Sequence, residues 1–351
     1  METEIKKITS IRDAGEILAK AGKLLRAGEL VAFPTETVYG LGANGLDSAA
    51  CKKIYQAKGR PSDNPLILHV DSFSLIERIA RRISPMAEKI MTAFCPGPIT
   101  LIMERRDIIP DNITGGLATV GIRMPENDIA RAMIKAAGVP IAAPSANISG
   151  RPSPTTAKAV ARDMLGKIPL ILDGGACTFG VESTIVDTTG EMATILRPGA
   201  ITREMLAELL GEKNVALDPA LIGKDSVPKA PGMKYKHYAP RAPLTLITGE
   251  PAKMLNAFKR EIERLTKSGH KVGVIASTEI IDALPLAPAQ KVSYGRRGDL
   301  KTIAANLYEA LRAFDDSDVD ALLGEATASD GLGLAIMNRL NKASGFNRIT
   351  A

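Results

Sequence analysis

The sequence predicts an α/β protein with two domains: a larger domain with a mixed sheet and a smaller domain with a parallel sheet. The first observation is length, because 351 residues are enough for two domains of ordinary size. The second is that short apolar runs alternate with helical patterns along most of the chain. The third is a break at 212–243, which is rich in Pro, Lys and Gly and has no sustained periodicity.

Residues 1–211 hold the larger set of predicted elements. Short apolar runs that end at Gly, Pro or polar residues predict strands, and patterns of helical period predict the helices between them. Thr202 is suited to cap the last helix and Gly211 to end it. The predicted strands are 30–33, 66–70, 99–104, 119–124, 140–145, 170–175, 183–189 and 193–199. The predicted helices are 12–27, 47–57, 72–82, 85–93, 127–137, 155–165 and 202–210.

Residues 244–351 show a second, shorter alternation of strands and helices. Because strand–helix–strand order favours parallel pairing, these residues predict a small parallel α/β domain. The break at 212–243 is then a linker or a functional segment between the two domains. The predicted strands are 244–249, 271–277 and 320–326, and the predicted helices are 251–269, 299–314 and 333–344.

Composition and charge narrow the class of protein. No apolar run approaches the ~18–20 residues of a membrane span, and the charged start lacks the apolar centre of a signal peptide. Three widely spaced cysteines without a C-x-x-C pair argue against a disulfide scaffold and a zinc site, so a cytoplasmic location is predicted. The net charge of +6 is typical of proteins that meet nucleotides, phosphates or RNA, and a solvated basic surface explains it equally well.

The segment FPTETVYGLGANG at 33–45 contains three glycines in the order G-x-G-x-x-G. A dinucleotide-binding turn places the first of these glycines at the tip of a strand, with an acidic residue about 20 positions later. Asp71 roughly fits the second requirement, but Pro34 ends the strand six residues before Gly40. The glycines therefore favour another role, and a nicotinamide oxidoreductase is kept only as an alternative. The sequence has no G-x-x-x-x-G-K-[ST] phosphate loop.

Polar loops stiffened by proline lie at or beside the predicted strand ends, where binding sites are commonly built. These loops carry Lys58, Arg60, Arg123 and Arg197, which predict a pocket for a polyanion. The loops are PTETVYG (34–40), KGRPSDNPL (58–66), CPGPIT (95–100), VGIRMP (120–125), APSANISGRPSPT (143–155), DGG (173–175), GVESTIVD (180–187) and LRPG (196–199).

Three motifs from these loops and a fourth from the break at 212–243, in their order along the chain, carry a resemblance to a known family. PTETVYGLG, the K-x-R tripeptide at 58–60, the S-x-N tripeptide at 145–147 and PGMKYKHYAP at 231–240 resemble the YrdC-type threonylcarbamoyl-AMP synthases in their long, two-domain form. The resemblance covers nearly the whole chain. It implies a YrdC-like catalytic domain at 1–211, a lid at 212–243 and a Rossmann-like α/β domain at 244–351.

The resemblance also implies a reaction. L-threonine, bicarbonate and ATP give L-threonylcarbamoyladenylate, pyrophosphate and water, and separate downstream threonylcarbamoyl-transfer proteins modify adenosine next to the anticodon of tRNA. Mg²⁺ is expected with the ATP phosphates, without a dedicated protein metal site. No membrane partner is expected. An RNA-binding module is the other alternative, and weak direct contact with tRNA stays open.

The resemblance assigns individual residues to the two substrates, with Lys58 and Arg60 as the catalytic pair. Two of them have plain structural alternatives: His69 as a half-buried strand histidine, and Lys58 as a solvated lysine at a helix end. Asn147 is alternatively a residue that orients its loop. The residues assigned to ATP are Lys58, Arg60, Asn64, Thr119, Ser145, Asn147, Ser153, Arg197 and Tyr238. The residues assigned to threonine are Thr37, His69, Arg123, Ala143 and Ser183.

Overall fold

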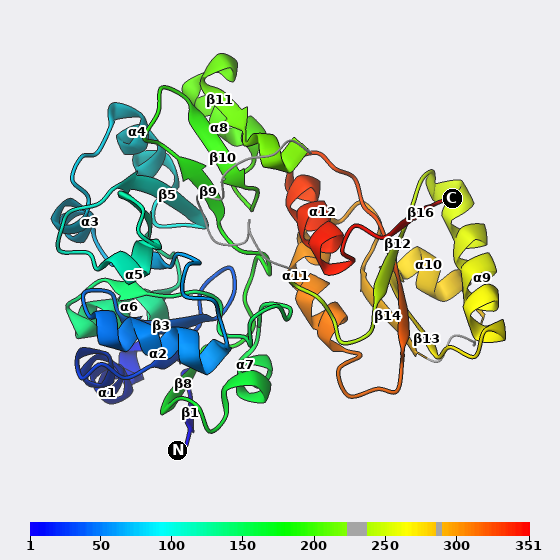
Figure 1. Ribbon diagram of the computed structural model, residues 1–351, viewed down its shortest axis with the longest axis horizontal. Coiled ribbons are helices and arrows are strands. Elements are labelled where there is room, and N and C mark those ends of the chain that lie inside the picture. Colours follow the sequence, from blue (N-terminus) through cyan, green and yellow to red (C-terminus); the bar gives the residue numbers. More distant parts are fainter. Residues whose placement is uncertain (223–236, 286–289) are drawn as a thin grey trace. The chain divides into compact units, whose positions relative to one another are not determined.

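The computed structural model describes residues 1–222, 237–285 and 290–351. The chain forms two compact units, one of Met1–Ser149 and Ser153–Lys234, the other of Gly150–Pro152 and Tyr235–Ala351 (Figure 1). Residues 223–236 of the predicted lid lie outside the described residues. Among the residues that are described, no helix is both long and apolar enough to cross a membrane.

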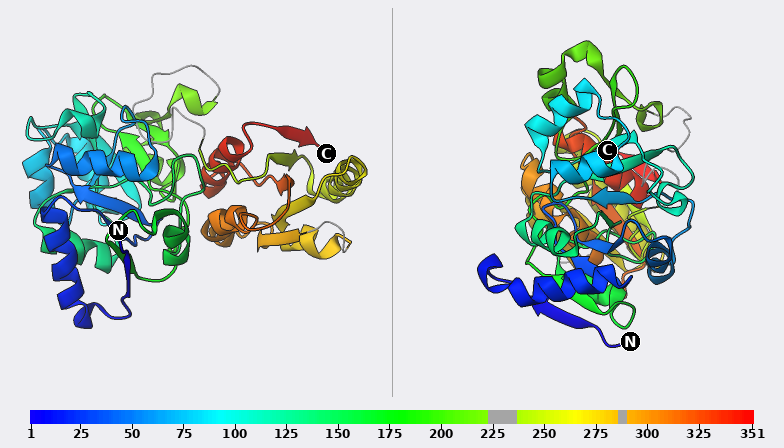
Figure 2. Two further views of the ribbon diagram at one scale, coloured as in Figure 1. Left: turned by 60° about the horizontal axis from the view of Figure 1, so that its bottom comes forward. Right: turned by 90° about the vertical axis from the view of Figure 1, so that its left-hand side faces the viewer.

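The first unit is built on one mixed sheet of eleven strands, in the order β1-β8-β2-β3-β7-β4-β6-β5-β9-β10-β11. Its N-terminal strand forms one edge (Figure 2). Parallel pairs such as β4–β6 alternate with antiparallel pairs such as β4–β7, which confirms the predicted mixed sheet. The strands are β1 Glu4–Lys7, β2 Val31–Phe33, β3 Gly40–Asn44, β4 Ile67–His69, β5 Ile99–Glu104, β6 Thr119–Arg123, β7 Ile141–Ala142, β8 Leu170–Asp173, β9 Thr184–Asp187, β10 Ala193–Arg197 and β11 Val215–Leu217.

The helices of the first unit begin and end where local chemistry favours it. Asp47 caps α2 by accepting the N–H groups of Ala49 and Ala50, and Gly59 ends it in the left-handed region at φ 60°. Thr202 caps α8 as predicted, and Gly211 follows its last turn. The helices are α1 Gly15–Arg26, α2 Ser48–Lys58, α3 Phe73–Ile79, α4 Pro85–Phe94, α5 Asp111–Thr114, α6 Asp128–Ala137, α7 Ala157–Met164 and α8 Arg203–Leu210.

The glycines of the G-x-G-x-x-G pattern do not form a nucleotide-binding turn. Gly40 and Gly42 lie inside the buried strand β3, antiparallel to β2. A Cβ atom at Gly40 would stand 2.8 Å from the ring of Phe33, and one at Gly42 would stand 3.0 Å from the same ring. These glycines therefore make room for an aromatic side chain that lies across the sheet.

The first unit extends beyond residue 211, where the sequence placed the domain boundary. Val215–Leu217 forms β11, which pairs in parallel with β10 and completes the sheet. A strand of three residues is too short for an alternating pattern to be recognised. Tyr238, which lies within the predicted lid at 212–243, is buried in the second unit, where its ring packs on that of Tyr308 with centroids 5.4 Å apart.

The second unit is a five-stranded sheet in the order β14-β13-β15-β12-β16, and every pair in it is parallel, as predicted. Helices α9 and α10 lie on one side of the sheet, and α11 and α12 lie on the other (Figure 1). The strands are β12 Leu244–Thr248, β13 Val272–Ser277, β14 Gln290–Gly295, β15 Ala321–Glu325 and β16 Arg348–Thr350. The helices are α9 Pro251–Lys267, α10 Thr278–Ala283, α11 Leu300–Arg312 and α12 Leu332–Ala343.

Candidate active site

The centre of the candidate site is the pair of parallel strands β4 and β6 in the first unit. Their register places His69 beside Arg123 at the carboxyl ends of the two strands. Both side chains are buried, with 4% and 5% of their surface exposed. A histidine and an arginine that are held side by side and shielded from water form a site for an anionic or polar group.

Glu36 reaches Arg123 from the loop between β2 and β3. Its Oε1 accepts a hydrogen bond of 2.7 Å from Nη2 of Arg123, and both side chains are about 95% buried. Within the described residues, Oε2 of Glu36 and Nε of Arg123 have no hydrogen-bond partner. The pair is therefore only half satisfied, and such a pair costs free energy unless a further group completes it.

His69 is held in its neutral form. Burial, together with the neighbouring charge of Arg123, lowers the pKa of His69 to about 3. Its ring meets Phe33 edge to face, with centroids 5.9 Å apart. A neutral imidazole can donate and accept hydrogen bonds without repelling Arg123, so the two side chains can share one ligand.

Thr37 belongs to the same group. It is fully buried, and its hydroxyl lies 2.9 Å from that of Thr35. Thr35 accepts the N–H of Val38 at 3.2 Å and donates to the Val38 carbonyl at 2.6 Å, so one side chain fixes the whole turn.

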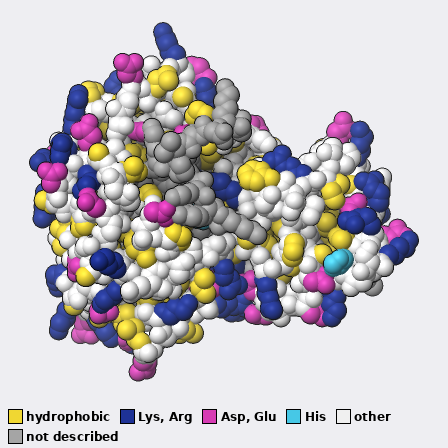
Figure 3. All heavy atoms as spheres, viewed as in Figure 1, with side chains coloured by type: hydrophobic (Ala, Val, Ile, Leu, Met, Phe, Trp, Pro, Cys, Tyr) yellow, Lys and Arg dark blue, Asp and Glu magenta, His cyan; other side chains and the backbone are white. Residues whose placement is uncertain are grey.

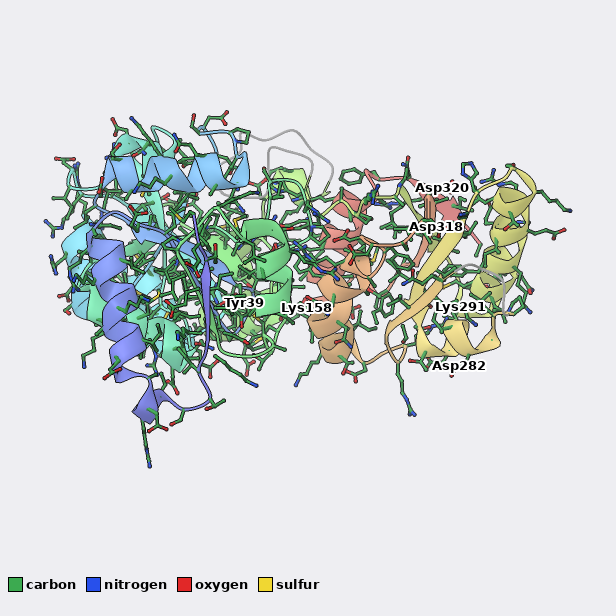
Figure 4. The ribbon with its side chains drawn as sticks, turned by 90° about the horizontal axis from the view of Figure 1, so that it is seen from below. Tyr39, Lys158, Asp282, Lys291, Asp318 and Asp320 are labelled. Atoms are coloured by element: carbon green, nitrogen blue, oxygen red, sulfur yellow. The ribbon has the colours of Figure 1, made fainter. Side chains whose placement is uncertain are left out.

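Tyr39 anchors the other end of this loop inside the first unit (Figure 4). Its hydroxyl donates to the carbonyl of Gly175 at 2.6 Å and accepts the N–H of Gly174 at 3.2 Å. Burial raises the pKa of Tyr39, which keeps the hydroxyl protonated for this role. The PTETVYG and DGG loops are thus tied together, and Glu36 and Thr37 gain a rigid frame.

Residues 182 and 183 join two further predicted residues to the site. Arg197, at the end of β10, donates from Nε and Nη2 to the Ser183 carbonyl at 3.1 and 3.0 Å. The hydroxyl of Ser183 lies 2.7 Å from that of Thr100. Ser153 donates to Glu182 at 2.6 Å. The loops at 153, 182–183 and 197 therefore form one buried polar cluster.

Lys58 is not a solvated lysine at a helix end, so that alternative is wrong. It is 2% exposed, and its ammonium donates to the carbonyls of Ser145 and Asn147. Arg60 and the buried Asn64 follow in the next loop, where Nη2 of Arg60 donates to the Pro65 carbonyl at 3.1 Å. The K-x-R and S-x-N tripeptides, far apart in sequence, thus meet at one place.

Predicted site residues lie at both ends of β4. Asn64 precedes the strand and His69 ends it, and Ala143 pairs near its start through a bond from its N–H to the Ile67 carbonyl. Thr119 begins β6, so it lies four residues from Arg123, roughly 13 Å at the rise of an extended strand. Thr119 is therefore on the side of Asn64, and Arg123 is on the side of His69. Tyr238 is the one predicted residue that belongs to the second unit.

Four buried polar residues of the site are absent from the sequence-based set: Thr35, Glu36, Thr100 and Glu182. A carboxylate in a turn is usually structural, so Glu36 gave no usable signal by itself. Its position three residues after a strand, inside a loop with two threonines, is the only sequence feature that marks it. Glu182 directly precedes the predicted site residue Ser183, and this position in the sequence could have indicated that Glu182 also belongs to the site.

No cluster of three or more His, Cys, Asp or Glu side chains that could hold a metal ion occurs in the described part of the chain. On the face drawn in Figure 3, Lys and Arg side chains are interspersed with Asp and Glu. That distribution does not favour a continuous basic surface for RNA on this face.

Known proteins resemble the chain along nearly all of its length. A family model described as telomere recombination matches residues 23–199, and one described as the C-terminal domain of threonylcarbamoyl-AMP synthase matches 201–345. The threonylcarbamoyl-AMP synthase of Pyrococcus abyssi (strain GE5 / Orsay) is 48% identical over 331 residues, 94% of each chain. That of Bacillus subtilis (strain 168) is 46% identical over 329 residues, 93% of each chain. The crystal structure of P. abyssi Sua5 complexed with L-threonine matches with a TM-score of 0.93 and 44% identity, over 99% of this chain and 100% of that one.

Proposed function

This chain belongs to the threonylcarbamoyl-AMP synthase family, and we propose that it makes L-threonylcarbamoyladenylate from L-threonine, bicarbonate and ATP, with release of pyrophosphate. It is a nucleotidyltransferase whose product serves the threonylcarbamoyladenosine modification of tRNA. Separate downstream proteins are proposed to carry out the transfer to tRNA.

The observation that carries the proposal is the half-satisfied pair of Glu36 and Arg123 beside a neutral His69. A threonine carboxylate has the charge and planar geometry that a guanidinium binds, and Arg123 retains a buried donor without a partner. Thr37, Ala143 and Ser183 complete the proposed threonine pocket, in which Thr37 and Ser183 supply hydroxyls and Ala143 supplies a small apolar contact.

The proposed ATP site is the cluster around Lys58 and Arg60 together with the buried polar cluster at 153, 182–183 and 197. Lys58 and Arg60 supply positive charge near one end of β4, and Arg197 supplies it on the neighbouring loops. The other proposed ATP contacts are Asn64, Thr119, Ser145, Asn147, Ser153 and Tyr238. Arg197 of the proposed ATP site bonds to Ser183 of the proposed threonine pocket, so the two proposed sites adjoin.

The chemistry needs this charge pattern. The threonine amine adds to bicarbonate and water leaves, which gives a carbamate. A carbamate oxygen then attacks the α-phosphorus of ATP, and the bond to pyrophosphate breaks. Bicarbonate and ATP are anionic, and threonine becomes so when its amine loses a proton and forms the carbamate, so positioning and charge neutralisation supply most of the rate enhancement. Lys58, Arg60 and Arg197 are proposed to stabilise the charge that moves to pyrophosphate.

Mg²⁺ is proposed to enter with the nucleotide phosphates. The nearest buried carboxylates, Glu36 and Glu182, already accept hydrogen bonds from Arg123 and Ser153. These groups fit a site in which phosphate oxygens, and not a protein cage, hold the ion. Residues 212–243 are proposed to act as a connection that covers the nucleotide, with Tyr238 at its end.

The direct test is to incubate the pure protein with ATP, labelled bicarbonate and L-threonine. We expect release of pyrophosphate that requires both threonine and bicarbonate, together with a labelled adenylate. Equal turnover of ATP without threonine would refute the proposal. L-serine serves as a matched amino acid for measuring how strongly the pocket selects threonine.

A further inference from the structure

The second unit contains a cavity of about 690 Å³, which the proposed reaction does not use. It lies where the strands of the parallel sheet end, against Thr248 at the end of β12, Ser277 at the end of β13 and Glu325 at the end of β15. Its volume is within the range of sites that bind metabolites and cofactors.

The topology explains why a cavity forms at this place. β13 and β15 are neighbours, but β13 leads into α10 and β15 leads into α12, which lie on opposite sides of the sheet (Figure 1). The two connections therefore run to opposite sides of the sheet at its carboxyl edge, and a crevice lies between them. In open parallel sheets this is the position where ligands bind.

The floor of the cavity is an ion pair in which both oxygens of the carboxylate accept hydrogen bonds. Glu325 is 2% exposed and accepts hydrogen bonds from the backbone N–H of Ser277 at 2.6 Å and from Nε and Nη2 of Arg297 at 3.0 and 2.6 Å. The hydroxyl of Tyr294 donates to the Glu325 carbonyl at 3.1 Å. Both carboxylate oxygens are thus used, so Glu325 orients Arg297 and does not itself need a ligand.

Several hydrogen-bond donors remain around this floor. Arg297 is about one third exposed, and Arg348 is exposed with no side-chain hydrogen bond or ion pair within the described residues. The Ser277 hydroxyl is buried and has no partner of acceptable distance and angle in the described part of the chain. The pKa of Glu279 is lowered mainly by the backbone N–H of Arg297 and to a small extent by the Ser277 hydroxyl. A ligand would therefore compete with the Glu279 carboxylate for the Ser277 hydroxyl.

The start of α12 adds a fourth donor group. This helix has twelve residues, and the loop before it, Ala326–Asp330, lines the cavity. A Cβ atom at Gly333 would stand 2.2 Å from the Ala328 carbonyl oxygen, so glycine allows the loop to lie against the first turn of the helix. Helix starts favour anions through their backbone N–H groups. Asp330, also on the rim, is exposed, and solvent screens its charge.

The remaining wall is apolar. Pro251 and Met254 come from α9, Leu300 and Ile303 from α11, and Met337 from α12. A ligand that fits the cavity therefore combines a compact anionic group with a body that tolerates apolar contacts.

We propose that this cavity binds a phosphorylated small molecule of about the size of a mononucleotide. Its phosphate is held by Arg297, Arg348 and the start of α12, Ser277 donates to it, and its organic body lies against the methionine-containing wall. The site is separate from the threonine and ATP sites of the first unit.

The test uses the full chain labelled with ¹³C at the methionine methyl groups. Met254 and Met337 line the cavity, and Met91 and Met124 are buried in the core of the first unit, so the spectrum reports the two units separately. We expect AMP or ribose 5-phosphate to shift the Met254 and Met337 signals in a saturable way, whereas adenosine and ribose do not. Arg348→Ala is expected to weaken this binding about ten-fold, and Arg296→Ala, the change of a neighbouring exposed arginine outside the cavity, is expected to leave it unchanged.

Three results would overturn the proposal. The first is that neither AMP nor ribose 5-phosphate, at a concentration on the order of 10 mM, shifts the methyl signals of Met254 or Met337. The second is an equal affinity for inorganic phosphate, since the organic body then contributes nothing. The third is an unaltered affinity in both Arg348→Ala and Ser277→Ala with the melting temperature unchanged. Because the readout is local to the second unit, an inactive first unit does not affect it.

Discussion

Each unit of this protein contains a buried glutamate whose side chain is paired with an arginine, Glu36 in the first unit and Glu325 in the second, and these two pairs differ in how fully they are satisfied. In the second unit, both oxygens of Glu325 accept hydrogen bonds, and Tyr294 and Ser277 hold the residue in place. In the first unit, Glu36 uses one oxygen only, and Arg123 keeps a buried Nε without a partner among the described residues. The same two residue types thus give a closed arrangement in one sheet and an open one in the other.

The difference shows which of the two pairs is complete without a ligand and which is not. A fully bonded buried pair contributes to a fixed geometry and loses much when one partner is removed. A buried pair with some hydrogen-bonding atoms unused loses the free energy of hydration of those atoms without gaining hydrogen bonds in exchange. Such a pair is retained where a ligand supplies the missing bonds. Glu325 therefore acts as a frame that orients Arg297, whereas we propose that Glu36 and Arg123 form part of a substrate site. Equivalent mutations in the two pairs should have different consequences.

The largest expected effect is on stability, from Glu325→Ala. Removing this carboxylate leaves the Arg297 guanidinium and the Ser277 N–H without their acceptor, which should lower the free energy of unfolding of the second unit by about 3–5 kcal/mol. Thermal unfolding followed by circular dichroism measures the loss. Glu279→Ala, the change of an exposed neighbour, is the control and should cost less than about 1 kcal/mol. Equal effects of the two changes would contradict the structural role.

Arg123→Ala should act on substrate binding instead. We expect the KM for threonine to rise about 100-fold, or about 2.7 kcal/mol, because a charge-assisted contact to the carboxylate is lost. The KM for ATP should change little. Arg60→Ala is the reverse case, with the larger loss in kcat/KM for ATP. Arg131→Ala on α6, an exposed arginine, is the control. A loss confined to ATP in Arg123→Ala would reverse the assignment.

The sequence anticipated the strands of the first unit because their apolar runs are bounded by turn residues. Each of the eight predicted strands contains an observed strand. β3 was missed because its residues, GLGAN, resemble a turn: the glycines leave space for Phe33, which no local pattern reveals. β1, β11, β14 and β16 were missed because each lies at the edge of a sheet, and an edge strand depends on a partner strand that the local sequence does not contain.

His69 gives the next effect, a dependence of stability on pH. Its pKa in the folded protein is about 3, below the ordinary value of about 6.5. Between these two pH values, the histidine is protonated in the unfolded chain but neutral in the folded chain. The stabilising contribution is present above pH 6.5 and is lost as the pH falls toward 3. Between pH 6.5 and 4.5 the free energy of unfolding should fall by about 2 kcal/mol more in the wild type than in His69→Gln.

Urea unfolding at several pH values measures this difference. His270→Gln changes an exposed histidine and is the matched control, which should follow the wild type. A wild-type pH dependence identical to that of His69→Gln would mean that His69 is not held neutral.

Sequence motifs predicted which residues belong to the candidate site, but they did not predict which of these residues contact one another. Lys58 and Arg60 were found through the K-x-R tripeptide, but nothing local shows that Lys58 bonds to the carbonyls of Ser145 and Asn147, nearly ninety residues later. Those bonds depend on the sheet order, which sets β7 beside β3 and β4. Glu36 was missed for the same reason, because its importance comes from a partner 87 residues away.

The smallest effect, and the one that tests the open pair most directly, is expected from Glu36→Gln. Glu36 occupies one edge of the Arg123 guanidinium, and a substrate carboxylate that binds Arg123 through two oxygens must compete with it. Glutamine keeps the size and one acceptor but removes the negative charge. The competing interaction weakens, and so does the repulsion of the incoming carboxylate. We therefore expect the KM for threonine to fall about three-fold, or about 0.6 kcal/mol, with the KM for ATP unchanged. Glu325→Gln, the equivalent change in the closed pair, should leave the KM for threonine at its wild-type value. A KM for threonine that rises in Glu36→Gln would show that the carboxylate binds the substrate amine and does not compete for Arg123.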